Sequence, residues 1–196
     1  MNIASKKYDP QIIEEKRTST HGETVVYKYT KGKFLGKGGF AKCYEFTNQQ
    51  TNQILAAKIV SKDSLTKHRA KQKLMSEIKI HRSLHHTGIV GFESFFEDSE
   101  NVFILLELCQ NQTLNELIRR RKRLTEIEAQ CFMMQLIKGL KYLHDHKVIH
   151  RDLKPANILI HDGVFKIADF GFAKYVDYSS SQMLRSCVGS PLYMAP

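Results

Sequence analysis

Residues 150–157 read His-Arg-Asp-Leu-Lys-Pro-Ala-Asn, and residues 169–171 read Asp-Phe-Gly. Together they place a carboxylate (Asp152), a cation (Lys154), an amide (Asn157) and a second carboxylate (Asp169) close together in the chain. Phosphoryl transfer requires such groups: an acceptor for the substrate hydroxyl proton, a positive charge near the phosphate, and oxygen ligands for Mg²⁺. A lone Asp more often caps a helix or a turn, and Asp-Phe-Gly alone is often a tight turn. Both motifs at this spacing favour a phosphoryl-transfer site.

A glycine-rich stretch at residues 36–41, Gly-Lys-Gly-Gly-Phe-Ala, is a second candidate for phosphate binding. Glycines allow backbone amides to approach a phosphate because no Cβ intervenes. A dinucleotide-binding fold would need a helix directly after these glycines and an acid about 20 residues later. Instead, residues 41–46 and 54–60 have the composition of two strands, with a polar turn at 47–52. The pattern therefore disfavours dinucleotide binding.

These motifs resemble the eukaryotic protein kinase family, from which residues 36–41 depart only in having Ala41 where a third glycine is usual. The resemblance implies an α+β, two-lobed fold, with a small antiparallel-sheet lobe at about 28–109 and part of a helical large lobe at about 110–196. It also implies ATP and Mg²⁺ as cofactors and protein Ser/Thr as substrate, since Lys154 followed by Pro is typical of Ser/Thr kinases. In this scheme Asp152 acts on the substrate hydroxyl, Lys154 stabilises the transferring phosphoryl group, and Asn157 and Asp169 hold Mg²⁺.

Lys58 lies within an apolar run at residues 55–60, where burial of an unpaired ammonium would be costly. It therefore requires an anionic partner. Glu77 is the candidate, because residues 67–84 have apolar side chains at helical spacing. By resemblance, Lys58 binds the ATP phosphates and pairs with Glu77 in the active enzyme.

The resemblance also assigns a nucleotide pocket. Leu106 would be the gatekeeper, and backbone groups of Glu107 and Cys109 would bond the adenine. An alternative is that the apolar members are ordinary core positions. The full expected set is Gly36, Lys37, Gly38, Gly39, Phe40, Ala41, Cys43, Ala56, Lys58, Leu106, Glu107, Cys109 and Leu159.

Composition limits the other function classes. The 196 residues can form one domain with a sizeable core, and the formal net charge is +10. Basic residues concentrate at 67–73 and 119–123, but no aromatic residues alternate with them, which favours a solvated face over a nucleic-acid surface. Attraction of acidic protein substrates or phosphorylated partners is a third option. No run of about 18 apolar residues and no signal-peptide core is present, and four scattered cysteines suggest a cytoplasmic or nuclear protein.

The order of elements follows from periodicity. Residues 1–27 mix charges with Ser and Thr and predict a flexible extension. Helices are predicted at 114–120 and 126–144, the second opened by a capping box of Thr125 and Glu128. Short strands are predicted at 148–149, 158–160 and 165–167.

The end of the chain resembles a kinase activation segment. By resemblance, Ser186 is the activating phosphosite, whose phosphate would pair with Arg151, and Ser190 contacts Asp152 and Lys154. The family pattern continues beyond the Ala-Pro at 195–196, so the chain matches about the first two thirds of a catalytic domain. We therefore expect this chain on its own to fold poorly and to be inactive. The alternative is a truncated or pseudokinase fragment that binds nucleotide or a protein partner.

Residues 34–45, 81–84, 91–98 and 107–109 are most similar to the Polo-like kinases, including Cys43 where most kinases have Val. Residues 155–157 instead follow the general Ser/Thr pattern, and 189–194 are closer to the autophagy-initiating kinases. Thr113 and Ala156 are neutral where kinases that select Arg carry acids. We therefore expect substrates that are acidic or neutral around the target hydroxyl.

Overall fold

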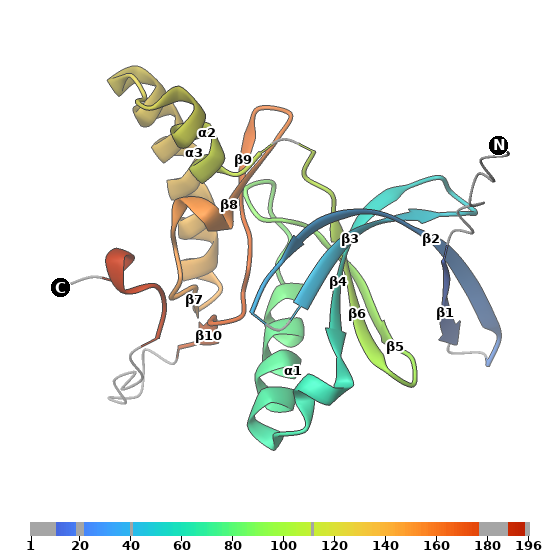
Figure 1. Ribbon diagram of the computed structural model, residues 1–196. Helices are drawn as coiled ribbons and strands as arrows, with labels where there is room; N and C mark the ends of the chain where they lie inside the picture. The colour runs from blue at the N-terminus through green and yellow to red at the C-terminus, as the bar shows by residue number, and fades with distance from the viewer. Residues whose placement is uncertain (1–10, 19–21, 40, 111, 177–187, 195–196) are drawn as a thin grey trace, which may run out of the picture. The chain divides into compact units, whose positions relative to one another are not determined.

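The computed structural model describes residues 11–18, 22–39, 41–110, 112–176 and 188–194 (Figure 1). The chain divides into two compact units. The first comprises residues 1–64 and 95–108, and the second comprises residues 65–94 and 109–196.

One sheet contains six strands in the order β1-β2-β3-β4-β6-β5. The strands are β1 (Ile12–Thr18), β2 (Thr24–Lys37), β3 (Ala41–Asn48), β4 (Ile54–Ser61), β5 (Phe92–Glu97) and β6 (Asn101–Glu107). Residues alternate between the two faces of a strand, and one face of β3, β4 and β6 is aromatic and aliphatic. That face forms the core of the first unit, whose buried members are Tyr29, Phe46, Leu55, Ala57, Phe103 and Leu105.

Strand β1 corrects the prediction of a flexible extension over residues 1–27, because Ile12–Thr18 pairs antiparallel with β2. Its most buried residue is an acid, Glu15, which is 2% exposed. The Glu15 carboxylate accepts hydrogen bonds from the Tyr29 hydroxyl at 2.8 Å and from Nε and Nη2 of Arg17 at 2.8 and 3.0 Å. The hydrogen bond to Glu15 raises the pKa of Arg17. Apolar periodicity does not predict this strand, because its buried position is occupied by the carboxylate of Glu15 and not by an apolar side chain.

Within its described residues, the second unit contains three helices and two strand pairs. The helices are α1 (His68–Arg82), α2 (Leu114–Arg121) and α3 (Glu126–Asp145). Strand β7 (Val148–Ile149) pairs with β10 (Lys174–Tyr175), and β8 (Ile158–His161) pairs with β9 (Val164–Ile167). The described residues also contain three short 3₁₀ turns: η1 (Lys62–Leu65), η2 (Pro155–Asn157) and η3 (Pro191–Tyr193).

The predicted helices and strands of this part of the chain are confirmed to within a residue or two. Thr125 accepts from the Glu128 N–H while the Glu128 carboxylate accepts from the Thr125 N–H, so the predicted capping box begins α3. A Cβ on Gly139 of α3 would lie 3.2 Å from the Gly88 carbonyl oxygen and 3.2 Å from Ile167 Cδ1. This close approach lets α3 pack directly on the strand that leads to Asp169. None of the helices in the described ranges is long and apolar enough to cross a membrane.

A two-residue turn joins β8 to β9. Asp162 and Gly163 both have positive φ, 48° and 77°. This is the conformation that Asp-Gly sequences favour, because it matches the twist of the flanking strands. The tight turn fixes the register between β8, which follows Asn157, and β9, which precedes Asp169.

Candidate active site

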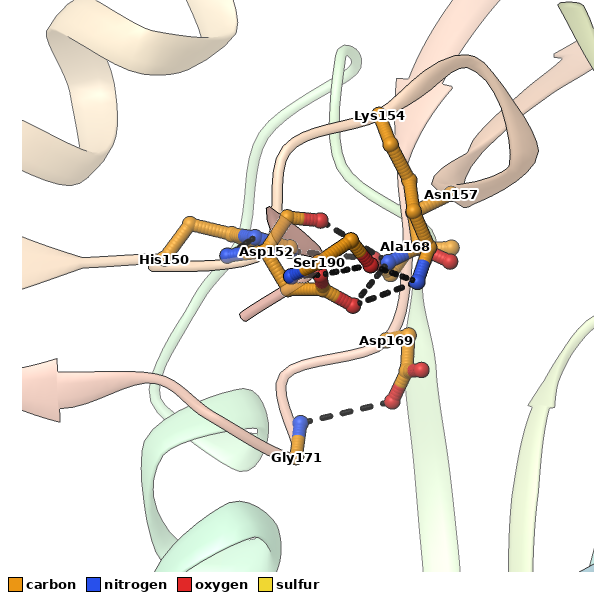
Figure 2. Close-up of polar contacts among 8 residues, drawn as sticks. All are labelled: His150, Asp152, Lys154, Asn157, Ala168, Asp169, Gly171 and Ser190. Carbon is orange, nitrogen blue, oxygen red and sulfur yellow. Dashed lines mark hydrogen bonds and ion pairs between the residues drawn. The ribbon is translucent and has the colours of Figure 1, made fainter. Parts of the chain in front are cut away.

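Asp152 lies at the centre of a polar cluster in the second unit (Figure 2), and it is 5% exposed. Its Oδ1 accepts hydrogen bonds from the backbone N–H and the hydroxyl of Ser190, at 2.9 and 2.8 Å. Its Oδ2 accepts from Lys154 Nζ at 2.8 Å and from Asn157 Nδ2 at 3.0 Å. Lys154 Nζ also donates to the Ser190 hydroxyl at 2.7 Å. Both carboxylate oxygens therefore have a fixed orientation, and the predicted contacts of Ser190 are confirmed.

Burial of the Asp152 carboxyl acts to raise its pKa, but hydrogen bonds from Lys154 and Ser190 act in the opposite direction and outweigh it. The pKa of Asp152 therefore lies below its usual value. Hydrogen bonds to the charged form have this effect because they stabilise the anion. Asp152 is accordingly ionised at neutral pH, as an acceptor of a hydroxyl proton must be.

His150, 2% exposed, joins the two site motifs. Its Nε2 lies 3.0 Å from the Ala168 carbonyl oxygen, and its Nδ1 lies 3.3 Å from the Asp152 amide nitrogen. A carbonyl only accepts and an amide N–H only donates, so we infer a neutral ring with its proton on Nε2. Burial lowers the pKa of His150, which is consistent with the neutral form. The imidazole thus holds the loop of Asp152 beside the strand end that leads to Asp169.

Two residues of the site have left-handed backbone conformations. The φ angles are 67° at Arg151 and 63° at Asp169. For residues other than glycine this conformation costs roughly 1–2 kcal/mol each. Hydrogen bonds hold both residues in place: Arg151 Nε donates to the Phe172 carbonyl at 2.7 Å, and the Gly171 N–H donates to Asp169 Oδ1 at 3.4 Å. The loops that carry the acidic groups are therefore preorganised.

Asn157 and Asp169 fit the expected role in holding Mg²⁺. Asn157 Nδ2 donates to the carbonyl and to Oδ2 of Asp152, at 2.9 and 3.0 Å, which directs the amide oxygen away from Asp152. The Ala168 N–H donates to the Asn157 carbonyl at 2.9 Å, which places Asn157 next to Asp169 in the cluster (Figure 2). Amide and carboxylate oxygens suit Mg²⁺, which is usually bound by one or two carboxylates together with phosphate oxygens. Among the described residues, no group of three or more His, Cys, Asp or Glu could hold a metal ion.

The sheet brings together several residues of the predicted nucleotide pocket. Gly36 pairs with Cys43, Cys43 with Lys58, and Ala56 with Leu106. Directly opposed residues share a face, and so do residues two apart on one strand. Cys43, Ala56, Lys58 and Leu106 therefore lie on the face opposite the aromatic core of the first unit.

The glycine-rich loop connects β2 to β3. The Gly38 N–H donates to the Ala41 carbonyl at 2.8 Å, which closes the turn, and Lys37 pairs with Lys42. Apart from Gly39 and its two chain neighbours, no atom of the described residues comes within 4 Å of the position that a Cβ on Gly39 would take, so the backbone there is open to a ligand. Phe40 lies outside the described residues.

Other predicted residues lie in separate parts of the chain. Glu107 ends β6 in the first unit and pairs with Leu55, whereas Cys109 follows it in the second unit. Leu159 is on β8, where it forms a bridge with Thr113. Glu77 is on α1 in the second unit and Lys58 is on β4 in the first, so their ion pair stays a prediction. Ser186 lies outside the described residues.

Sequence reasoning missed the role of Gly189. Its φ is 115°, and a Cβ there would lie 2.4 Å from the Arg151 carbonyl oxygen. Only glycine fits this approach, which carries Ser190 onto Asp152. The sequence signal was a glycine directly before the serine, but its meaning depends on the backbone of residue 151.

A family model described as the protein kinase domain matches residues 29–196. The chain belongs to the protein kinase family. It is 59% identical over 186 residues to a probable serine/threonine-protein kinase CCRP1 of Zea mays, 94% of this chain and 30% of that protein. It is 48% identical over 169 residues to the serine/threonine-protein kinase polo of Drosophila melanogaster, 86% of this chain and 29% of that protein.

A third relative is the serine/threonine-protein kinase PLK1 of Xenopus tropicalis, 45% identical over 194 residues, 98% of this chain. The resemblance to Polo-like Ser/Thr kinases is thus confirmed, and so is the α+β kinase fold class. The chain spans about 30% of the length of these relatives.

Proposed function

We propose that this chain carries the catalytic machinery of a Polo-like serine/threonine kinase, which transfers the γ-phosphate of ATP to Ser or Thr hydroxyls of proteins. The observation that carries the proposal is the Asp152 carboxylate, held by Lys154, Asn157 and Ser190 at 2.8–3.0 Å. An ionised, oriented carboxylate beside an ammonium is the arrangement required to position a hydroxyl for in-line attack on a phosphoryl group.

In this proposal each residue has one task. Asp152 orients the substrate hydroxyl and accepts its proton, and Lys154 places a positive charge next to the transferring group. Asn157 and Asp169 hold Mg²⁺ through their side-chain oxygens. Bound Mg²⁺ offsets the charge of the ATP phosphates. The protein contributes chiefly by position and charge, because the transition state for phosphoryl transfer is loose.

The sheet face that carries Cys43, Ala56, Lys58 and Leu106 is proposed to bind the nucleotide. Lys58 would bind the phosphates and Leu106 would limit the adenine pocket. Each of these residues lies on the face opposite the aromatic core, which supports the assignment over the alternative of ordinary core positions.

The proposed substrates are acidic or neutral around the target hydroxyl. Thr113 is the N-cap of α2, and its N–H and hydroxyl bond to the Glu116 carboxylate at 2.8 and 3.1 Å. Glu116, the nearest acid to Thr113 in the sequence, is therefore bonded within its own helix rather than directed at a basic substrate residue. With a net charge of +10, the chain favours acidic protein partners. Activation by phosphorylation of Ser186 and a cytoplasmic or nuclear location are part of the same proposal.

The test is Lys58→Met and Asp169→Ala in the complete protein, assayed by transfer of labelled γ-phosphate to a generic acidic substrate. Each change removes a charge that acts on the phosphates or on Mg²⁺, so turnover should fall by about 10³-fold or more. Lys42→Met is the control, because Lys42 is exposed on β3 next to Cys43 and thus lies on the other face. Near-normal turnover in either site variant would refute the assignment. ATP binding by the unaltered protein without any transfer would favour the alternative, a nucleotide-binding pseudokinase.

A further inference from the structure

Phe172 follows directly on the Asp-Phe-Gly motif and is held from two sides within the second unit. Lys73 of α1 places its Nζ 3.8 Å from the centroid of the Phe172 ring. On the backbone side, Arg151 Nε donates to the Phe172 carbonyl at 2.7 Å. One residue therefore joins α1 to the loop that carries Asp152.

Two further contacts join α1 to the same segment. A Cβ on Gly171 would lie 3.4 Å from Glu77 Oε2 and 3.2 Å from Asp169 Oδ1, so the backbone at Gly171 fits closely against both carboxylates. The Tyr175 hydroxyl lies 2.9 Å from Ser83 Oγ, just beyond the end of α1. Lys73 and Glu77 are four residues apart and thus lie on one side of the helix. Contacts at Lys73 and Glu77 of α1 and at Ser83 after its end join this part of the chain to the segment, and the Lys73 contact is nearest to the N-terminus of α1.

We propose that Lys73 is a positioning residue for the metal-holding Asp169. Its ammonium attracts the face of the Phe172 ring, which keeps the segment after Asp169 against α1. Asp169 has a left-handed backbone (φ 63°), a conformation that needs support from its surroundings. Phe172, fixed at its ring by Lys73 and at its carbonyl by Arg151, supplies that support. This inference rests on the proposed function only for its consequence, the binding of Mg²⁺ with ATP.

The competing view is that Lys73 is one of many solvated lysines, since its side chain is exposed. The two views differ in what a conservative change does. If residue 73 acts through a cation–π contact with the Phe172 ring, any cationic side chain of similar length should serve. A guanidinium binds an aromatic face at least as well as an ammonium. Lys73→Arg should therefore keep the segment after Asp169 in place. Lys73→Met, which retains the apolar stem but not the charge, should loosen that segment.

Hydrogen–deuterium exchange of the complete protein provides a readout that does not depend on catalysis. The segment contains two hydrogen-bonded amides as reporters: the Ala173 N–H donates to the Phe170 carbonyl at 2.9 Å, and the Val176 N–H donates to the Lys147 carbonyl at 2.8 Å. Local opening controls exchange of such amides. An exposed cation–π contact corresponds to about a two- to fivefold change in the opening equilibrium. Exchange of residues 171–176 should rise by that factor in Lys73→Met.

Three further variants complete the test. Phe172→Leu should raise the exchange of residues 171–176 as much as Lys73→Met does. Exchange in the double variant should exceed that of either single variant by no more than experimental error, because both changes remove the same contact. Lys79→Met is the control, since Lys79 is exposed on the same helix. The Mg²⁺ concentration needed for half-maximal ATP binding should rise two- to fivefold in Lys73→Met and stay unchanged in Lys73→Arg.

Unchanged exchange in Lys73→Met, or an equal change in Lys79→Met, would overturn the proposal. Lys73→Arg behaving like Lys73→Met would overturn it too. If the unaltered protein transfers no phosphate while the exchange pattern holds, the proposed function fails and the positioning role of Lys73 stands.

Discussion

Gly189→Ala is the most direct test of how Ser190 reaches Asp152. The new Cβ would lie 2.4 Å from the Arg151 carbonyl oxygen, at a φ of 115° that L-residues rarely adopt. Arg151 cannot yield easily, because its own backbone is left-handed (φ 67°) and its Nε is bonded to Phe172. We therefore expect the Gly189 segment to move away instead, which withdraws Ser190 from the site.

The size of the effect follows from the bonds lost. Ser190 donates two hydrogen bonds to Asp152 Oδ1, at 2.9 and 2.8 Å, and accepts one from Lys154 at 2.7 Å. A hydrogen bond to a charged group contributes about 1.5–3 kcal/mol. If the catalytic geometry loses the equivalent of one such bond, the rate falls by roughly 10- to 10²-fold, since each factor of ten is about 1.4 kcal/mol. The segment itself is largely exposed, with Leu192 at 92%, so its displacement should leave the melting temperature nearly unchanged.

Gly163→Ala is the matched control. Gly163, in the turn between β8 and β9, also has a positive φ, 77°, but no atom of the described residues other than those of Gly163 and its chain neighbours lies within 4 Å of the added Cβ. The Gly163→Ala substitution should lower the free energy of unfolding by about 1 kcal/mol through backbone strain alone, and it should leave kcat/KM unchanged. The two variants are compared by thermal melting and by phosphate transfer from ATP to a peptide. A folded Gly189→Ala protein with wild-type kcat/KM would refute the reasoning.

Other predictions follow from the same site. Ser186→Ala should lower turnover of the complete protein, and phosphopeptide mapping of active enzyme should find phosphate on Ser186, which would pair with Arg151; a map without it contradicts the assignment. A peptide array should show no selection for Arg upstream of the target, because Thr113 and Ala156 are neutral. Burial lowers the pKa of His150 below the ordinary value of about 6.5, so the unfolded state binds more protons and stability falls as pH drops below about 6.5. His150→Gln should reduce that slope by up to about 1.4 kcal/mol per pH unit, measured by denaturant unfolding between pH 7.5 and 5.5; an unchanged slope would show that His150 does not titrate.

The sequence alone was sufficient to group the residues of the candidate site and to predict most of the second unit. Asp152, Lys154 and Asn157 lie within six consecutive positions between β7 and β8, so their proximity follows from spacing. Helices α1, α2 and α3 follow from apolar periodicity, and Thr125 with Glu128 marks the start of α3 within four residues. Such features are local, because the groups that determine them are neighbours along the chain.

Tertiary structure decided what depends on the path of the backbone between distant residues. The contact of Ser190 with Asp152 spans 38 positions, and glycine is required at position 189 because the Arg151 carbonyl lies against it and its φ is 115°. The proton position on His150 depends on Ala168, 18 residues away. Strand β1 is similar, since Glu15 can be buried only where Tyr29 and Arg17 meet its carboxylate. Composition could not reveal these features because the free energy of a buried polar group depends on the partner that the fold places beside it.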